Sequence, residues 1–137
     1  MSLTLNYTVL HAYDTRLEGI TVPAAVTLGA AVVRFDAKVD TGSTHCVFQR
    51  EHGEELGLII ESGFAQRFRT AAGSFQTYGH EVTLTVLGIE TTAMVFFAAD
   101  EAFPANVLGR VGWLDRVCLG LVDCEGRLYL SDYNDPA

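Results

Sequence analysis

The sequence predicts an all-β domain whose short strands close into a barrel-like core. Stretches in which apolar and polar residues alternate recur along the chain, and this period of two is typical of half-buried strands. Turn-forming residues separate the stretches at short intervals, as in sandwich and barrel domains. With 137 residues and 49% hydrophobic composition, the chain can build one substantial core. We therefore expect a single domain spanning residues 1–137.

The N-terminal half is expected to contain four strands and a short helical segment. The strands are predicted at residues 3–9, Ile20–Leu28, Ala31–Val39 and 46–48, and the helical turns at residues 50–56. Pro23 favours an edge position or a bulge for the second strand, because proline has no N–H to donate. Gly57 is a stop signal for the helical turns.

The C-terminal half is expected to begin with a hairpin and to end with another. The first hairpin pairs residues 64–70 with 75–78, and the closing hairpin pairs 117–123 with 127–130. Between them we expect a strand at 82–86, a strand buried on both faces at 92–98, and a helix at 108–116. Such a succession of short elements fits the all-β class better than any helical architecture.

The loop that begins at Asp40 is the most informative feature of the chain. The predicted strand 31–39 runs directly into Asp40-Thr41-Gly42-Ser43, a sequence that can turn sharply and direct a carboxylate out of the sheet. An ordinary surface turn is the alternative interpretation, since aspartate, glycine, serine and threonine are common turn residues.

Three motifs in order give this loop its context. Asp40-Thr41-Gly42-Ser43 is followed by Leu56-Gly57 at the end of the helical turns and then by Val107-Leu108-Gly109. Together they resemble the motifs of retropepsin-like aspartic proteases, the single-domain relatives of pepsin found in retroviruses and in many bacteria. The resemblance extends from about Val33 to Tyr133 and implies the retropepsin-like acid protease fold.

The resemblance also implies an enzyme, an aspartic endopeptidase that cleaves peptide or protein substrates. This chemistry needs two carboxylates that share one proton, so that one activates a water and the other acts as an acid. The chain has a single Asp-Thr-Gly motif. Asp40 is therefore the expected catalytic residue, and a second Asp40 is expected from the other subunit of a homodimer.

Further roles follow from the resemblance alone. Thr41 is expected to bond the partner's loop, Gly42 to offer its N–H to substrate or to a carboxylate, and Ser43 to donate to the outer oxygen of Asp40. The first hairpin corresponds to the family's flap, the mobile segment that closes over a bound peptide. The flap tip expected to contact substrate consists of Ala71, Ala72, Gly73 and Ser74.

Composition and cysteine content exclude several other classes of function. A net charge of −8 argues against nucleic acid and anionic membrane as partners, and no apolar stretch has the length of a membrane span. The histidines and cysteines have no metal-ligand spacing and no phosphate-binding loop is present, so we expect no metal and no cofactor. Three cysteines without close pairing and no recognisable signal peptide favour reduced thiols in the cytoplasm; a Cys118–Cys124 disulfide is the alternative.

Two functions of different classes remain open from the sequence. The first is the homodimeric aspartic endopeptidase, which the intact Asp40-Thr41-Gly42-Ser43 favours because a simple binding protein has no need of the acid. The second is a catalytically inactive module of the same fold that binds a peptide or dimerises without cleaving anything.

Overall fold

The structure is a computed structural model that describes residues 1–134, and strands dominate it. The single α-helix is α1 (Arg50–Glu55), and short 3-10 helices occupy Ile60–Ser62, Leu114–Arg116 and Asp123–Glu125. The strands are β1 (Val9–Ala12), β2 (Ile20–Leu28), β3 (Ala31–Val39), β4 (Val47–Phe48), β5 (Phe64–Thr70), β6 (Gly73–Val86), β7 (Ile89–Ala98), β8 (Val107–Leu108), β9 (Val117–Val122) and β10 (Arg127–Asp132). The predicted all-β class is confirmed.

Six strands form a closed ring of hydrogen-bonded neighbours. The order is β2-β3-β8-β4-β7-β6, and β6 pairs back to β2, while β5 extends the sheet beyond β6. Alternate residues of β2 and β3 point into the ring, which explains the alternation in their sequences. Val22, Val26, Leu84 and Phe97 are among the fully buried side chains that fill it.

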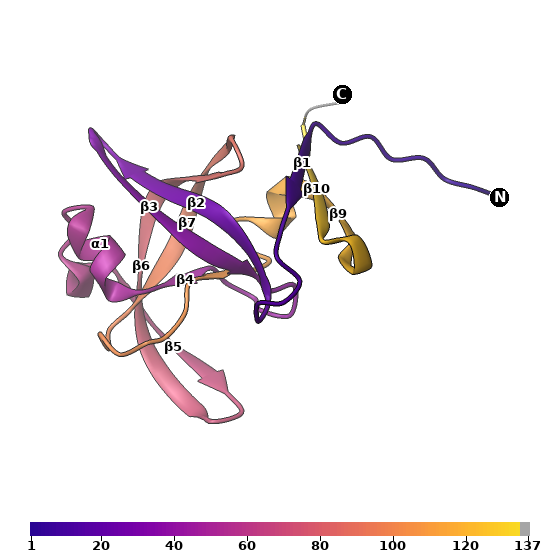
Figure 1. Cartoon of the computed structure of the whole chain (residues 1–137). Coiled ribbons are helices and arrows are strands. Elements are labelled where there is room, and N and C mark those ends of the chain that lie inside the picture. The colour runs from indigo at the N-terminus through magenta and orange to yellow at the C-terminus, as the bar shows by residue number, and fades with distance from the viewer. Residues whose placement is uncertain (135–137) are drawn as a thin grey trace.

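Strands from the N-terminal and C-terminal parts of the chain form a separate three-stranded sheet with the order β1-β10-β9 (Figure 1). The predicted first strand at residues 3–9 is wrong in its position, because β1 begins at Val9. Leu3 and Leu5 alternate as a strand would, yet they are 85% and 74% exposed and pair with no strand among the described residues. Alternation alone does not make a strand; backbone partners are also required.

The β5–β6 hairpin projects from the ring of strands, as Figure 1 shows. Its turn consists of Ala71 and Ala72, and Thr70 pairs with Gly73 across the strands. The separate strands predicted at 75–78 and 82–86 are in fact one continuous strand, β6, which pairs with β5 at one end and with β2 at the other. This length lets one strand belong to both the hairpin and the ring.

Two further expectations need correction. The strand predicted at 92–98 begins at Ile89 and is buried on both faces only near its end, since Met94 is 44% exposed. The helix predicted at 108–116 is reduced to the 3-10 helix Leu114–Arg116. Gly112 has a φ of +98°, which ends any helix there, and the preceding N–H groups bond to another loop instead of to their own turn.

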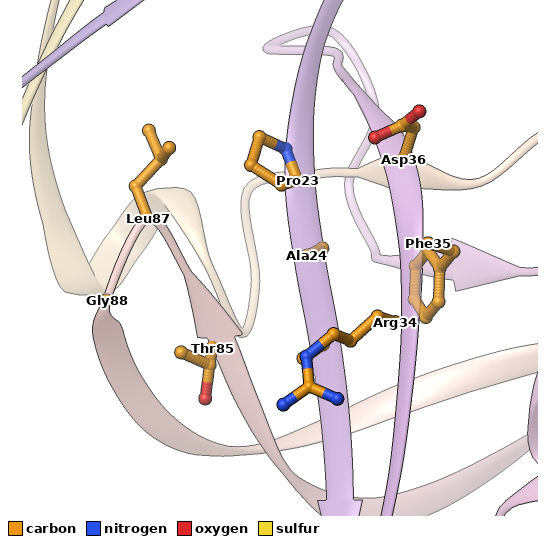
Figure 2. Close-up of a pocket in the computed structure, with 9 residues that line it drawn as sticks. Pro23, Ala24, Arg34, Phe35, Asp36, Thr85, Leu87 and Gly88 are labelled. Atoms are coloured by element: carbon orange, nitrogen blue, oxygen red, sulfur yellow. The ribbon is translucent and has the colours of Figure 1, made fainter.

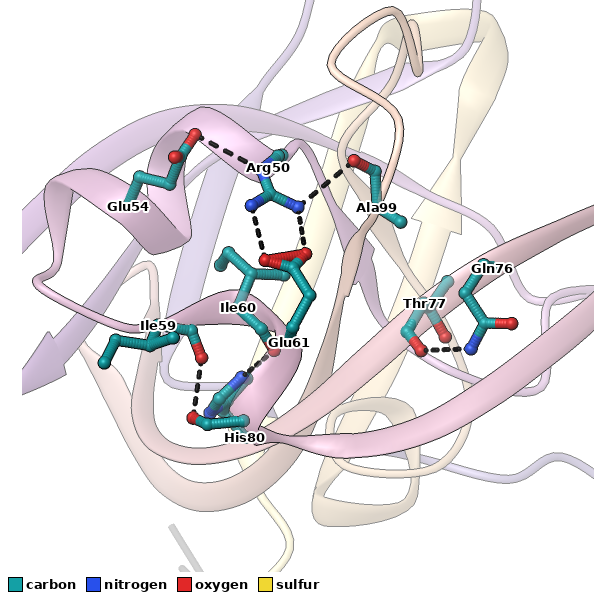
Figure 3. Close-up of polar contacts among 10 residues, drawn as sticks. Arg50, Glu54, Ile59, Ile60, Glu61, Gln76, Thr77, His80 and Ala99 are labelled. Atoms are coloured by element: carbon teal, nitrogen blue, oxygen red, sulfur yellow. Dashed lines mark hydrogen bonds and ion pairs between the residues drawn. The ribbon is translucent and has the colours of Figure 1, made fainter.

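Polar contacts attach α1 to the base of the hairpin (Figure 3). The Arg50 guanidinium donates to both carboxylate oxygens of Glu61 and to the Ala99 carbonyl. The His80 ring on β6 bonds the Ile60 carbonyl at 2.9 Å. These contacts connect the helix, the segment after it and two strands, so the stem of the hairpin rests on an ordered support.

Candidate active site

The end of β3 delivers Asp40 into a tight loop whose backbone holds the carboxylate in place. The Asp40 N–H donates to the Leu108 carbonyl at 2.9 Å, which continues the parallel pairing of β3 with β8. The Gly42 N–H donates to Oδ1 of Asp40 at 3.0 Å, and the Ser43 N–H donates to the Asp40 carbonyl at 3.1 Å. The carboxylate is therefore oriented by a backbone donor while the residue stays exposed to solvent.

A second segment, which follows β8, holds the far side of the loop. The N–H groups of Arg110 and Val111 donate to the carbonyls of Ser43 and Thr44 at 2.9 and 2.8 Å. Gly109 permits this approach, because a Cβ atom there would lie 2.2 Å from the His45 carbonyl oxygen. The Val-Leu-Gly motif noted in the sequence thus acts as the support of the Asp40 loop.

The three residues after Asp40 agree with their sequence-based roles to different degrees. Gly42 is well suited to its place, since an added Cβ would press to 3.3 Å on Oδ1 of Asp40. Thr41 is exposed, where a partner's loop can reach it. The Ser43 expectation is wrong in this structure: its hydroxyl donates to the His45 carbonyl at 3.0 Å and not to Asp40. The turn directs the Ser43 side chain along the loop, where the nearer acceptor is a backbone oxygen.

A groove of about 480 Å³ lies between the Asp40 loop and the β5–β6 hairpin. Its lining comes from these two segments and the start of β4: Asp40, Gly42, Ser43, Thr44, His45, Val47, Gln66, Arg67, Phe68, Arg69, Thr70 and Phe75. The predicted tip residues Ala71, Ala72, Gly73 and Ser74 are exposed and lie outside this lining. The stem of the hairpin, and not its tip, borders the groove in the free chain.

His45 joins the floor of the groove to the hairpin. Its ring stacks on Phe68 with centroids 5.0 Å apart and planes 12° apart. The centroids of the His45 and Phe96 rings also lie 5.0 Å apart, in an edge-to-face arrangement. Partial burial lowers the pKa of His45 below its ordinary value, because the charged form loses hydration there. Neither His45 nor Phe68 was predicted as a groove residue, although Phe68 opposite Phe75 in the hairpin indicated an apolar inner face.

Cys46 lies behind the loop and is a core residue. It is fully buried, and its sulfur accepts the Gly109 N–H at 3.4 Å. Burial raises the pKa of its thiol to about 11, so the thiolate needed for a nucleophile is scarce at neutral pH. Cys118 and Cys124 are exposed free thiols.

A second hollow, of about 440 Å³, lies over β2 and β3 near the turn between β6 and β7 (Figure 2). Pro23, Arg34, Asp36 and Leu87 are among its lining residues. It shares no residue with the groove at Asp40. The two hollows are therefore separate surfaces, and only the groove contains the Asp-Thr-Gly loop.

Residues 1–134 contain neither a cluster of metal ligands nor a membrane-spanning helix. No group of three or more metal-ligating side chains is arranged around a common point in this part of the chain. No helix in the same range combines the length and the apolar character needed to cross a membrane.

Comparisons with known proteins identify the family. A family model described as aspartyl protease matches residues 17–111, a range that contains Asp40, its loop and β8. The chain belongs to this aspartyl protease family. The resemblance read from the three motifs is thereby confirmed. No curated protein matches the chain at a significant level.

Comparison with solved structures shows that this member of the aspartyl protease family has the retropepsin fold. A retropepsin-like aspartic protease from Rickettsia conorii matches with a TM-score of 0.67 at 17% identity, over 90% of this chain and 97% of that one. EIAV protease, solved with an inhibitor, matches with a TM-score of 0.51 at 19% identity, over 66% of this chain and 80% of that one. At these identities the likeness establishes the fold.

Proposed function

We propose that the protein is an aspartic endopeptidase that works as a homodimer. The observation that carries the proposal is the Asp40 carboxylate, which is exposed at a groove and oriented by the Gly42 N–H. A structural aspartate in a surface turn needs neither a groove nor the second supporting segment after β8. Membership of the aspartyl protease family supports the same conclusion.

In the proposed mechanism, two Asp40 carboxylates hold a water between them and share one proton. Like charges so close cannot both ionise, so one carboxylate keeps a proton that it donates in a hydrogen bond to the scissile carbonyl. The ionised carboxylate takes a proton from the water, which attacks the carbonyl carbon, and the acid then protonates the leaving amine. Asp40 is the only carboxylate among residues 1–134 that lines the groove of one chain, so we expect the second to come from a partner.

The three-stranded terminal sheet is the proposed dimer surface. Its outer strands β1 and β9 each have one edge without a partner among the described residues. Leu10 on β1 and Leu121 on β9 are large apolar side chains that are 57% and 42% exposed. A second copy of the chain that covers these residues would satisfy the open edges and bury the apolar surface.

The test compares Asp40→Asn with the matched variant Asp36→Asn, which removes an exposed carboxylate from β3 outside the groove. The amide oxygen of the substituted side chain can still accept the Gly42 N–H, so we expect the fold and the dimer to persist. Cleavage of a denatured protein substrate should fall by about a thousandfold or more in Asp40→Asn, whereas Asp36→Asn should retain it. Asp40→Asn protein that cleaves as well as the wild type would show that the proposed chemistry is wrong.

A mixing experiment tests the shared site. After subunit exchange, an equal mixture of wild-type and Asp40→Asn chains should keep about half of the activity per wild-type chain, since mixed dimers contain one carboxylate. An equal mixture of wild-type and Asp36→Asn chains should keep the full activity per total chain, since every dimer in it contains two Asp40 carboxylates. Full activity in both mixtures, together with a monomer in sedimentation equilibrium, would exclude the shared site. Tight peptide binding without cleavage by the wild type would instead indicate the binding module.

A further inference from the structure

Two arginines border the same groove as Asp40. Arg67 and Arg69 lie on β5, two residues apart, and both line the groove. Neighbouring residues of a strand point to opposite faces, so the two arginines share the face of β5 opposite to Phe68, whose ring stacks on His45 in the groove, and they border the groove only at its rim. Their Cα atoms are about 7 Å apart, the distance spanned by two residues of a strand.

Neither arginine is neutralised by a carboxylate within residues 1–134. Arg67 donates to the Ser74 hydroxyl at 3.1 Å, which holds it across the hairpin, and neither Arg67 nor Arg69 makes a salt bridge in this range. Four other arginines of the chain do pair with carboxylates: Arg16, Arg50, Arg116 and Arg127. In a chain with a net charge of −8, two arginines without a carboxylate partner in this range make the rim of the groove locally basic.

The charged side chains close to the groove determine which ligands it attracts. At physiological ionic strength the Debye length is about 8 Å, so acidic residues elsewhere on the surface are largely screened. Within the groove, Asp40 is the only acidic lining residue in the part of the chain that the structure describes, and it is the proposed reaction centre. A guanidinium group matches the planar carboxylate of an aspartate or glutamate with two parallel hydrogen bonds.

The position of the arginines favours an extended peptide as the ligand. β5 is the last strand of its sheet, so one of its edges is open to pairing with a peptide backbone. Alternate side chains of a paired peptide repeat every 7 Å or so, which matches the spacing of Arg67 and Arg69. A nucleic acid fits less well. Within residues 1–134, the groove offers only two cationic side chains to the phosphates, and the Asp40 carboxylate would repel them.

We infer that the groove selects peptides with aspartate or glutamate side chains close to the cleaved bond, and that Arg67 and Arg69 determine this specificity. The inference rests on the proposed function, since it names the substrate class of the same site. The inference also predicts that the preference for acidic peptides depends on pH. A glutamate side chain in a peptide ionises with a pKa of about 4.3, so the preference for glutamate over glutamine should rise as the pH passes through that region.

The first experiment profiles cleavage of a peptide library by the wild type, by Arg67→Gln/Arg69→Gln and by Arg34→Gln. Arg34 is exposed and outside the groove, so its variant controls for loss of positive charge from the chain. We expect acidic residues to be enriched near the wild-type cleavage site. The ratio of kcat/KM for a glutamate peptide over its glutamine twin should fall about fivefold per arginine removed, and Arg34→Gln should leave the ratio unchanged.

The second experiment measures binding without cleavage. Fluorescein-labelled glutamate and glutamine peptides are titrated with Asp40→Asn protein, with and without the two arginine substitutions, and followed by anisotropy. Tighter binding of the glutamate peptide that the arginine substitutions abolish would support the inference even if no peptide is cleaved, in which case only the proposed catalysis fails. Efficient cleavage or binding with no acidic preference would overturn the inference and leave the proposed function intact.

Discussion

Replacement of Gly109 by alanine should disrupt the Asp40 loop from behind. The new Cβ would lie 2.2 Å from the His45 carbonyl oxygen and 2.7 Å from that of Ser43, closer than real Cβ contacts allow. Both obstacles are backbone atoms, so a side-chain rotation cannot relieve them. The Asp40 loop and the segment after β8 must therefore move apart.

The expected loss in the free energy of unfolding of Gly109→Ala has two contributions. Overpacking in a close-packed interior costs about 1–3 kcal/mol. Separation of the two segments also weakens the Arg110 and Val111 hydrogen bonds to the loop, at about 1 kcal/mol each. We expect a loss of about 3 kcal/mol in the free energy of unfolding, which corresponds to a fall of about 12 °C in Tm for a chain of this size. The Asp40 N–H bond to Leu108 lies one residue away, so kcat should fall about a hundredfold as the carboxylate shifts.

Gly29→Ala is the matched control. Gly29 has a φ of +60° and no heavy atom within 4 Å of an added Cβ, so alanine there suffers only the left-handed backbone, about 1 kcal/mol. Both variants are compared by urea unfolding and thermal melting at equal protein concentration, because dimerisation makes Tm depend on concentration. If Gly109→Ala were as stable as Gly29→Ala and fully active, the loop would not depend on this close approach.

Two further predictions concern titrating groups. With its pKa raised to about 11, Cys46 should resist iodoacetamide in the native protein while Cys118 and Cys124 react, and should be labelled only in denaturant; rapid native labelling of Cys46, detected by peptide mass spectrometry, would contradict its burial. Burial lowers the pKa of both His45 and His52, so the unfolded chain binds protons more readily and the free energy of unfolding should fall as the pH drops below about 6.5. His52→Asn should reduce this fall, and a pH dependence unchanged by the substitution would refute the assignment.

Much of the fold was readable from the sequence because its strands alternate regularly. The bounds of β2 and β3 match the prediction, since their inward residues face one continuous core. Residues 3–9 alternate as clearly, but β10 pairs only with Val9 and the three residues after it. Periodicity records which side chains could be buried, whereas pairing depends on a strand more than a hundred residues away.

In the candidate site, too, the features set by local sequence were predictable and those set by tertiary contacts were not. The Asp40 loop was recognisable because its turn chemistry is local and its motif is short. The groove residues Arg67 and His45 were not, because they meet only after the hairpin folds back over the loop. The segment after Leu108 was predicted as a helix on local grounds, yet its N–H groups bond the Ser43 and Thr44 carbonyls. A tertiary partner outweighed the local preference there.

The proposed dimer also follows from how one chain connects its parts. Ile20, the first residue of β2, lies opposite Val39, so the segment that arrives from β1 reaches the ring beside the Asp40 loop. The His11 ring bonds the Thr21 carbonyl at 3.2 Å and holds the terminal sheet to the same end of the ring. The two features that one chain leaves incomplete, a single carboxylate and a sheet with open edges, therefore lie at one end of the molecule. A single two-fold axis at that end can complete both, which is why we expect loss of dimerisation and loss of cleavage to occur together.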